Sequence, residues 1–87
     1  MPILELEDVD LEPLVLDGIE VPRIYRHGGA PPFTTLRFDG AEYQYERSFP
    51  IKGYGASLPN FLRERMAEGK KPLLIERTDR FYVYTST

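Results

Sequence analysis

Apolar and polar residues alternate on both sides of Asp39-Gly40, as in strands with one buried face. An Asp-Gly pair favours a type I′ turn, because both central residues of that turn need positive φ. A two-residue loop here gives the pairs Phe38 with Ala41, Arg37 with Glu42, Leu36 with Tyr43, Thr35 with Gln44, and Thr34 with Tyr45. One face of this hairpin then carries Leu36, Phe38, Tyr43 and Tyr45, and the other carries Arg37, Glu42, Gln44 and Glu46.

Two further hairpins follow from similar patterns. Asp17-Gly18 pairs Leu16 with Ile19 and Leu14 with Val21. Pro13 and Pro22 fall opposite each other in this register and cannot donate ladder hydrogen bonds, so this ribbon should be short or lie at a sheet edge. The third hairpin joins residues 73–77 to 81–85 through 78–80, and its nearly continuous apolar character predicts a central strand pair.

One helix is predicted over about 58–68. Leu58, Phe61, Leu62 and Met66 are spaced as one helical stripe. Ser57 is the expected N-cap, and Gly69 is expected to end the helix in a left-handed conformation.

These elements predict an α+β fold in the order β-β-β-β-α-β-β, with an additional extended segment possible at residues 3–7. The three antiparallel β-hairpins should form a curved sheet or a partly open barrel. A chain of 87 residues is one small domain, spanning 1–87. A single helix cannot cover both faces of such a sheet, so either the sheet curls or a second copy covers it.

Charge is distributed unevenly along the chain. Residues 1–20 contain seven acids and no base, and an acidic N-terminal segment covers about residues 1–12. The remaining residues hold 14 − 7 = 7 acids and all 11 bases, so the two parts carry −7 and +4. Such asymmetry fits an acidic arm that binds its own basic body, a body that binds an external anion, or two solvated surfaces.

Composition limits the setting in which the chain works. The chain has no cysteine, which removes disulfide and thiolate chemistry and favours a reducing, cytoplasmic location. The first residues are acidic, unlike a signal peptide. No apolar run approaches the roughly 20 residues of a membrane helix, so no membrane partner is expected.

A candidate anion site lies at the expected start of the helix and comprises Lys52, Gly53, Tyr54, Gly55 and Ser57. The N–H groups and positive dipole end of a helix attract anions, and Lys52 adds charge. The segment lacks the pattern of a phosphate-binding P-loop. A sharp turn followed by a serine cap explains the same residues without any ligand.

Catalysis and metal binding find little support. Arg26 and His27 form a possible loop site in 26–32, but His27 is the single histidine and no cysteine accompanies it. Residues 55–59 resemble a nucleophile elbow with its last glycine replaced by proline, and nothing places His27 beside Ser57. The alternating acids Asp8, Asp10 and Glu12 lack the glycine of a calcium loop. We therefore expect no enzyme activity, no cofactor and no metal.

Aromatic and basic residues are interleaved, as in Tyr45-Glu46-Arg47 and Arg80-Phe81-Tyr82. Sheets that bind single-stranded nucleic acid use both types, but a pI near 5.1 gives no basic field and makes nucleic acid an unfavoured partner. The excess of tyrosine instead suits a protein interface. We expect a small interaction module that self-associates, as a homodimer, through an aromatic sheet surface, and a different protein is the other partner that such a surface would suit. The alternative is a binder of a small anion, nucleotide or single-stranded nucleic acid at the Lys52–Ser57 loop and helix N-terminus.

Overall fold

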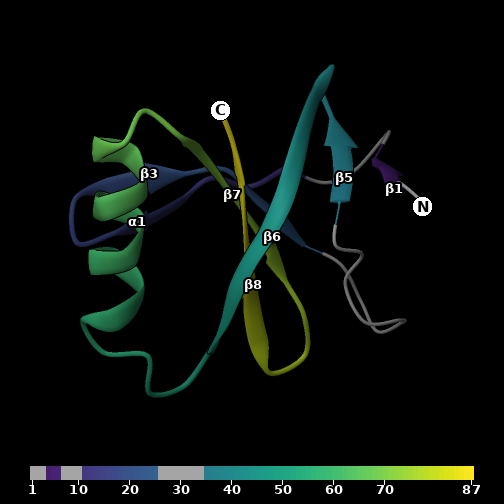
Figure 1. Ribbon diagram of the computed structural model, residues 1–87. Coiled ribbons are helices and arrows are strands. Elements are labelled where there is room, and N and C mark those ends of the chain that lie inside the picture. Colours follow the sequence, from purple (N-terminus) through teal and green to yellow (C-terminus); the bar gives the residue numbers. More distant parts are fainter. Residues whose placement is uncertain (1–3, 7–10, 26–34) are drawn as a thin grey trace.

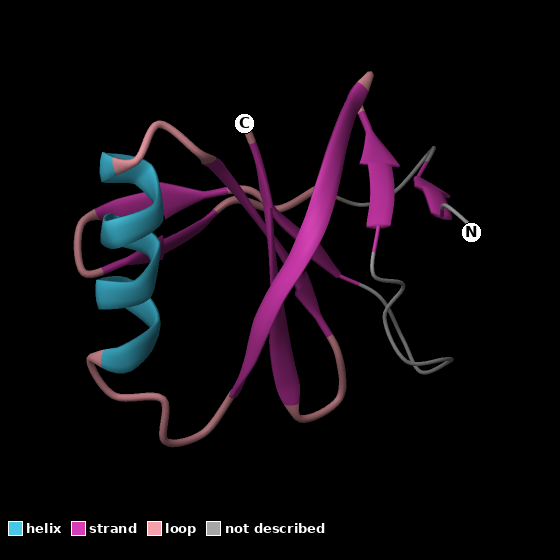
Figure 2. Ribbon diagram, viewed as in Figure 1, coloured by secondary structure: helices cyan, strands magenta, loops and turns pink. Residues whose placement is uncertain are grey.

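The computed structural model describes residues 4–6, 11–25 and 35–87. It contains eight strands and one helix within these ranges (Figures 1 and 2). The elements are β1 (Leu4–Leu6), β2 (Leu14–Leu16), β3 (Ile19–Val21), β4 (Arg23–Tyr25), β5 (Thr35–Phe38), β6 (Ala41–Pro50), α1 (Ser57–Ala67), β7 (Lys71–Glu76) and β8 (Arg80–Ser86).

Six strands form one mixed sheet in the order β1-β5-β6-β8-β7-β4. The four central strands are antiparallel, whereas β1 and β4 pair in parallel with β5 and β7. Strands β2 and β3 make a separate two-stranded sheet. The large sheet curls into a half-barrel (Figure 1), so the predicted α+β class and the predicted curvature are confirmed.

All three predicted hairpins form, and the first two have the predicted register over the described residues. The predicted 78–80 connection of the third is wrong by one residue, because Arg80 already belongs to β8 and its carbonyl accepts a hydrogen bond from the N–H of Arg77, which leaves residues 78 and 79 as the loop. Strands β5 and β6 pair Leu36 with Tyr43, and β2 and β3 pair Leu16 with Ile19. Asp39 and Gly40 have φ values of 52° and 77°, as a type I′ turn requires. The β7–β8 hairpin is central, as expected. The predicted partner of Tyr45, Thr34, lies outside the described residues.

Strand β4 was not predicted as an element of its own. Pro22, between β3 and β4, cannot donate a ladder hydrogen bond, so the hairpin stops at Val21. The carbonyl oxygen of Pro22 accepts a hydrogen bond of 3.0 Å from the N–H of Leu74, and the chain continues as a parallel edge strand against β7. The proline that keeps the small ribbon short therefore also directs the chain onto the large sheet.

Helix α1 matches the predicted helix to within one residue at each end. Leu58, Phe61 and Leu62 are buried, whereas Met66, expected on the same stripe, is exposed. Gly69 ends the helix with φ 84°, and the N–H of Lys70 bonds to the carbonyl of Arg65. These features confirm the predicted left-handed end.

The prediction that Ser57 caps the helix is wrong. Ala56, which precedes the helix, already has helical dihedrals, and no side chain caps the first turn. Ser57 is instead the first helical residue, and its N–H bonds to the carbonyl of Tyr54 at 3.0 Å. A side chain inside the first turn no longer faces the N–H groups that a cap satisfies.

Two cores lie on opposite faces of the large sheet, because successive strand residues point to opposite sides. The first core packs α1 and the β2–β3 hairpin, which lie side by side in Figure 1, against one face. Its buried members are Leu16, Val21, Phe49, Leu58, Phe61, Leu62, Leu74, Phe81 and Val83. The second core fills the inside of the curl with Ile24, Leu36, Tyr43, Leu73, Ile75 and Tyr84. Curling thus buries the face that the helix leaves uncovered.

Candidate functional site

The face of the sheet that carries the second core continues into a partly exposed strip of tyrosine and arginine. Tyr45 of β6 is 37% exposed, and its ring centre lies 6.1 Å from that of half-buried Tyr82 and 5.6 Å from that of buried Tyr84. The guanidinium of Arg77 lies 5.9 Å from the Tyr82 ring. Arg80 Nε donates a 3.0 Å hydrogen bond to Ser48 Oγ, and Ser48 is the register partner of Tyr82. We call Tyr45, Ser48, Arg77, Arg80 and Tyr82 the tyrosine–arginine face.

Tyr45 was predicted to share the apolar face of its hairpin with Tyr43, and it does lie on the side of the second core. The strands bury Tyr43, however, and leave Tyr45 at the margin of that core. A tyrosine in this place offers both an apolar ring and a hydroxyl to a partner.

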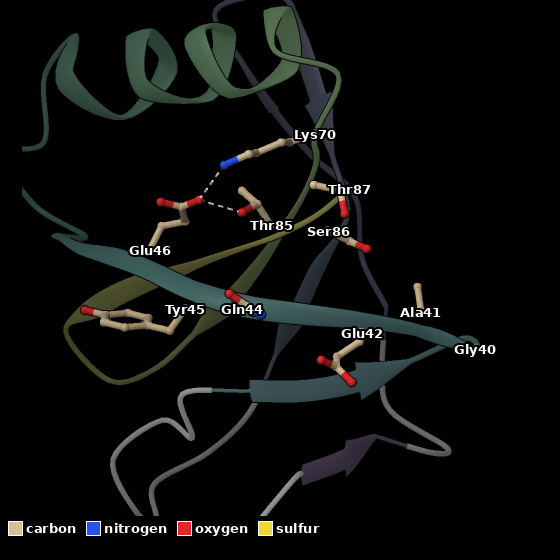
Figure 3. A pocket seen from close by; sticks show the side chains of 10 residues that line it. All are labelled: Gly40, Ala41, Glu42, Gln44, Tyr45, Glu46, Lys70, Thr85, Ser86 and Thr87. Atoms are coloured by element: carbon tan, nitrogen blue, oxygen red, sulfur yellow. Dashed lines mark hydrogen bonds and ion pairs between the residues drawn. The ribbon is translucent and has the colours of Figure 1, made fainter. Parts of the chain in front are cut away.

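A polar groove of about 590 Å³ runs along β6 on the side of Glu42 and Gln44, opposite to the face that carries the Tyr45 ring (Figure 3). Acidic, amide and hydroxyl side chains from β6 and β8 line it, together with Lys70 after the helix. The lining residues are Gly40, Ala41, Glu42, Gln44, Tyr45, Glu46, Lys70, Thr85, Ser86 and Thr87. Glu42 is exposed, and within the described ranges no ion pair involves it.

A β-bulge places Glu46 in this groove. The register of β6 against β8 shifts between Tyr45 and Arg47, so Glu46 is the additional residue. Its carboxylate accepts a 2.7 Å hydrogen bond from the Thr85 hydroxyl and lies 3.5 Å from Lys70 Nζ and 3.6 Å from Arg65 Nε (Figure 3 draws the Thr85 and Lys70 contacts). The hydrogen bond from Thr85, followed by the charges of Lys70 and Arg65, lowers the pKa of Glu46 below 4.5 although burial opposes this. The bulge therefore ties the loop after α1 to the middle of β6.

Replacing Glu46 by glutamine should lower the free energy of unfolding at pH 7 by about 1–2 kcal/mol, because a charged acceptor is lost. A lowered native pKa stabilises the fold above the unfolded value of 4.5 and ceases to do so as the pH falls through the native value. The difference between wild type and Glu46→Gln in urea denaturation should therefore shrink below pH 4.5. Glu42→Gln, on the same strand but exposed, is the control and should cost less than about 0.5 kcal/mol at pH 7. A pH-independent loss in Glu46→Gln would contradict the assignment.

The candidate anion segment is divided between structural and exposed positions. Gly53 and Gly55 have φ values of 96° and 56° and shape the turn. The Tyr54 ring packs on Phe81, with 6.1 Å between the two ring centres. Ser57 and Lys52 are exposed. The Ser57 N–H is used by Tyr54, and Pro59 has no N–H, so the first turn offers an anion little beyond the N–H of Leu58.

Lys52 instead lines a second hollow, of about 420 Å³, beside the loop between β7 and β8. Its other lining residues are Pro50, Ile51, Thr78, Asp79 and Arg80. Arg80 thus belongs both to this hollow and to the tyrosine–arginine face. Two cations and one carboxylate face the same space, which leaves a small net positive charge.

The remaining candidate residues contribute less to the picture. Arg26, His27, Asp8 and Asp10 lie outside the described residues, and Glu12 is held by Arg23 at 2.9 Å. Among the described side chains no group of three or more histidines, cysteines or acids is arranged to hold a metal ion. Within the same ranges no helix is long and apolar enough to cross a membrane.

Part of the acidic N-terminal region pairs with basic residues of the same chain, which is one of the three explanations considered for the uneven charge. Glu12 pairs with Arg23, and Asp17 Oδ2 lies 2.6 Å from Arg63 Nη2 on the helix. The groove around Glu46 and the tyrosine–arginine face were both missed as sites. The interleaved Tyr45-Glu46-Arg47 pointed to an aromatic and basic surface. The bulge that places Glu46 in the groove has no reliable sequence signature.

Comparison with protein-family models, with curated proteins and with solved structures finds no match for this chain.

Proposed function

We propose that this domain is an interaction module that self-associates as a dimer through the tyrosine–arginine face. The observation that carries the proposal is Tyr45, which is 37% exposed in the middle of a strand and packs edge-on against Tyr84 and at a tilt against Tyr82. Tyrosine and arginine are enriched in protein interfaces, where the ring supplies apolar area and the guanidinium supplies directed hydrogen bonds.

The order of tyrosine and arginine along the face supports a second copy as the partner. Arg77 and Arg80 lie at one end of the face and Tyr45 lies at the other, whereas Glu42 and the groove lie on the opposite side of β6. A two-fold axis across the face would bring the arginines of each copy to the Tyr45 ring of the other, and guanidinium groups pack well on tyrosine rings. Interfaces of this kind use the same patch on both subunits and must be self-complementary in this way.

The dimer should be reversible. The chain exposes 5399 Å² at a mass of 10.1 kDa, close to the roughly 5,300 Å² expected of a folded monomer of this mass. Because curling already covers the second core, folding does not require a partner. Association then buries only the exposed side chains of the tyrosine–arginine face. Weak interfaces of this kind are small.

A concentration series of ¹⁵N-resolved NMR spectra tests the location of the interface. From micromolar to millimolar protein we expect amide shifts centred on Tyr45, Ser48 and Tyr82. Val15 on the small hairpin and Met66 on the helix are also exposed and serve as internal references that should not shift. Shifts centred on Val15 or Met66, or no concentration dependence, would contradict the proposal.

A second candidate function is anion binding in the hollow shared by Lys52 and Arg80. Lys52 is exposed, and within the described ranges it has no ion-pair partner. Millimolar phosphate or nucleotide should then shift the amides of residues 51, 52 and 78–80, and Lys52→Ala should abolish the shifts. Shifts that persist in Lys52→Ala, or that appear at residues 57 and 58 instead, would remove this candidate.

A further inference from the structure

Two short N-terminal segments lie at the two edges of the large sheet. Strand β1 pairs with β5 at one edge. At the other edge Leu11 forms an isolated bridge with Ile24 of β4, and the N–H of Glu12 bonds to the carbonyl of Arg23 at 2.9 Å. Figure 1 shows β1 beside β5, far from the helix. Uncovered strand edges pair readily with other chains, so this covering has a consequence for association.

The two contacts of this segment differ in how firmly they are held. Arg23 binds Glu12 through Nη2 and Glu76 of β7 through Nη1, both at 2.9 Å, and the side chains of Arg23 and Glu76 are each 17% exposed. Strand β1 is only three residues long and pairs on one side. A short outermost strand with one neighbour opens more easily than a segment whose Glu12, although 66% exposed, pairs with a largely buried arginine.

The register of β1 against β5 indicates which residues suit a strand that pairs with the outer edge of β5. Leu4 lies opposite Leu36, Glu5 opposite Arg37, and Leu6 opposite Phe38. Leu36 is fully buried in the second core, whereas Arg37 is exposed on the other side of its strand. The edge of β5 therefore suits an extended segment with an acidic residue between two apolar ones.

We propose that the outer edge of β5 is a strand-acceptor site, and that its occupant in a second assembly is Leu4–Leu6 of another copy of this chain. Each chain supplies one donor strand and one acceptor edge, so two chains can exchange β1 around a two-fold axis and leave no site empty. Strand exchange does not use the tyrosine–arginine face and does not depend on the function proposed for it.

Cysteine trapping in the full-length chain tests this exchange. Because the natural chain has no cysteine, two single substitutions report on one contact. An affinity-tagged Glu5→Cys chain is mixed with an untagged Arg37→Cys chain under mild oxidation. A disulfide requires Cα atoms within about 7 Å, so the mixed disulfide should form at a yield at least about tenfold above a Glu5→Cys and Asp79→Cys mixture, since Asp79 is exposed in the distant β7–β8 turn. Equal yields in the two mixtures would overturn the proposal.

A second experiment uses a peptide and therefore keeps the charges that the cysteine substitutions remove. A synthetic peptide of residues 2–7 is added to the unmodified chain, and amide shifts are expected at 35–38. The same peptide with Glu5→Lys places like charges opposite each other at Arg37 and should shift these amides several-fold less. Shifts at 23–25 only, or equal effects of both peptides, would count against an acceptor at β5. Adding Tyr45→Ser to the trapped chains should leave the disulfide yield unchanged, which separates this test from that of the proposed function.

Discussion

Replacing Leu62 by alanine should lower the free energy of unfolding by about 2–5 kcal/mol. Leu62 is fully buried on the face of α1 that packs against the sheet. Its truncation leaves a cavity between the helix and the first core, which the surrounding strands cannot close because they are held by ladder pairs on both sides. A domain of 87 residues has a total stability of about 4–13 kcal/mol, so one substitution removes a large share.

Met66→Ala on the same helix is the matched control, since Met66 is 44% exposed. It should change the free energy of unfolding by less than about 1 kcal/mol. Urea denaturation followed by circular dichroism measures both variants. Similar losses in the two variants would mean that α1 does not pack on the sheet through the face described.

Replacing Tyr45 by serine should raise the dissociation constant of the dimer at least about tenfold, as truncation of a central interface aromatic does. The ring is lost from the face, and with it the apolar area that the arginines of the second copy would contact. Tyr45→Phe keeps the ring and should change the constant by less than about threefold, because the hydroxyl adds at most one net hydrogen bond. Each variant must first be seen to fold by circular dichroism, since Tyr45 also packs on Tyr84.

Most of the secondary structure was predictable because local chemistry decides it. Asp17 and Asp39 both adopt positive φ before a glycine, and this turn fixes the register of each hairpin by the period-two pattern alone. The helix followed from Leu58, Phe61 and Leu62, and its end from Gly69. In each case the signal lies within a few neighbouring residues.

The parts that could not be predicted depend on contacts between distant segments. The parallel pairing of β4 with β7 joins residues about fifty positions apart, and only its proline break was visible in the sequence. The bulge at Glu46 depends on Thr85, Lys70 and Arg65 meeting one carboxylate. The exposure of Tyr45 likewise depends on how far the sheet curls, which the pairing of β5 with β6 does not determine.

Sedimentation equilibrium of the wild-type chain from micromolar to millimolar concentration tests the proposed self-association most directly. We expect the average mass to rise from one chain of 10.1 kDa toward two, with the rise displaced to higher concentration in Tyr45→Ser and not in Tyr45→Phe. A single monomer mass over the whole range would contradict it, and so would a dimer that Tyr45→Ser leaves unchanged.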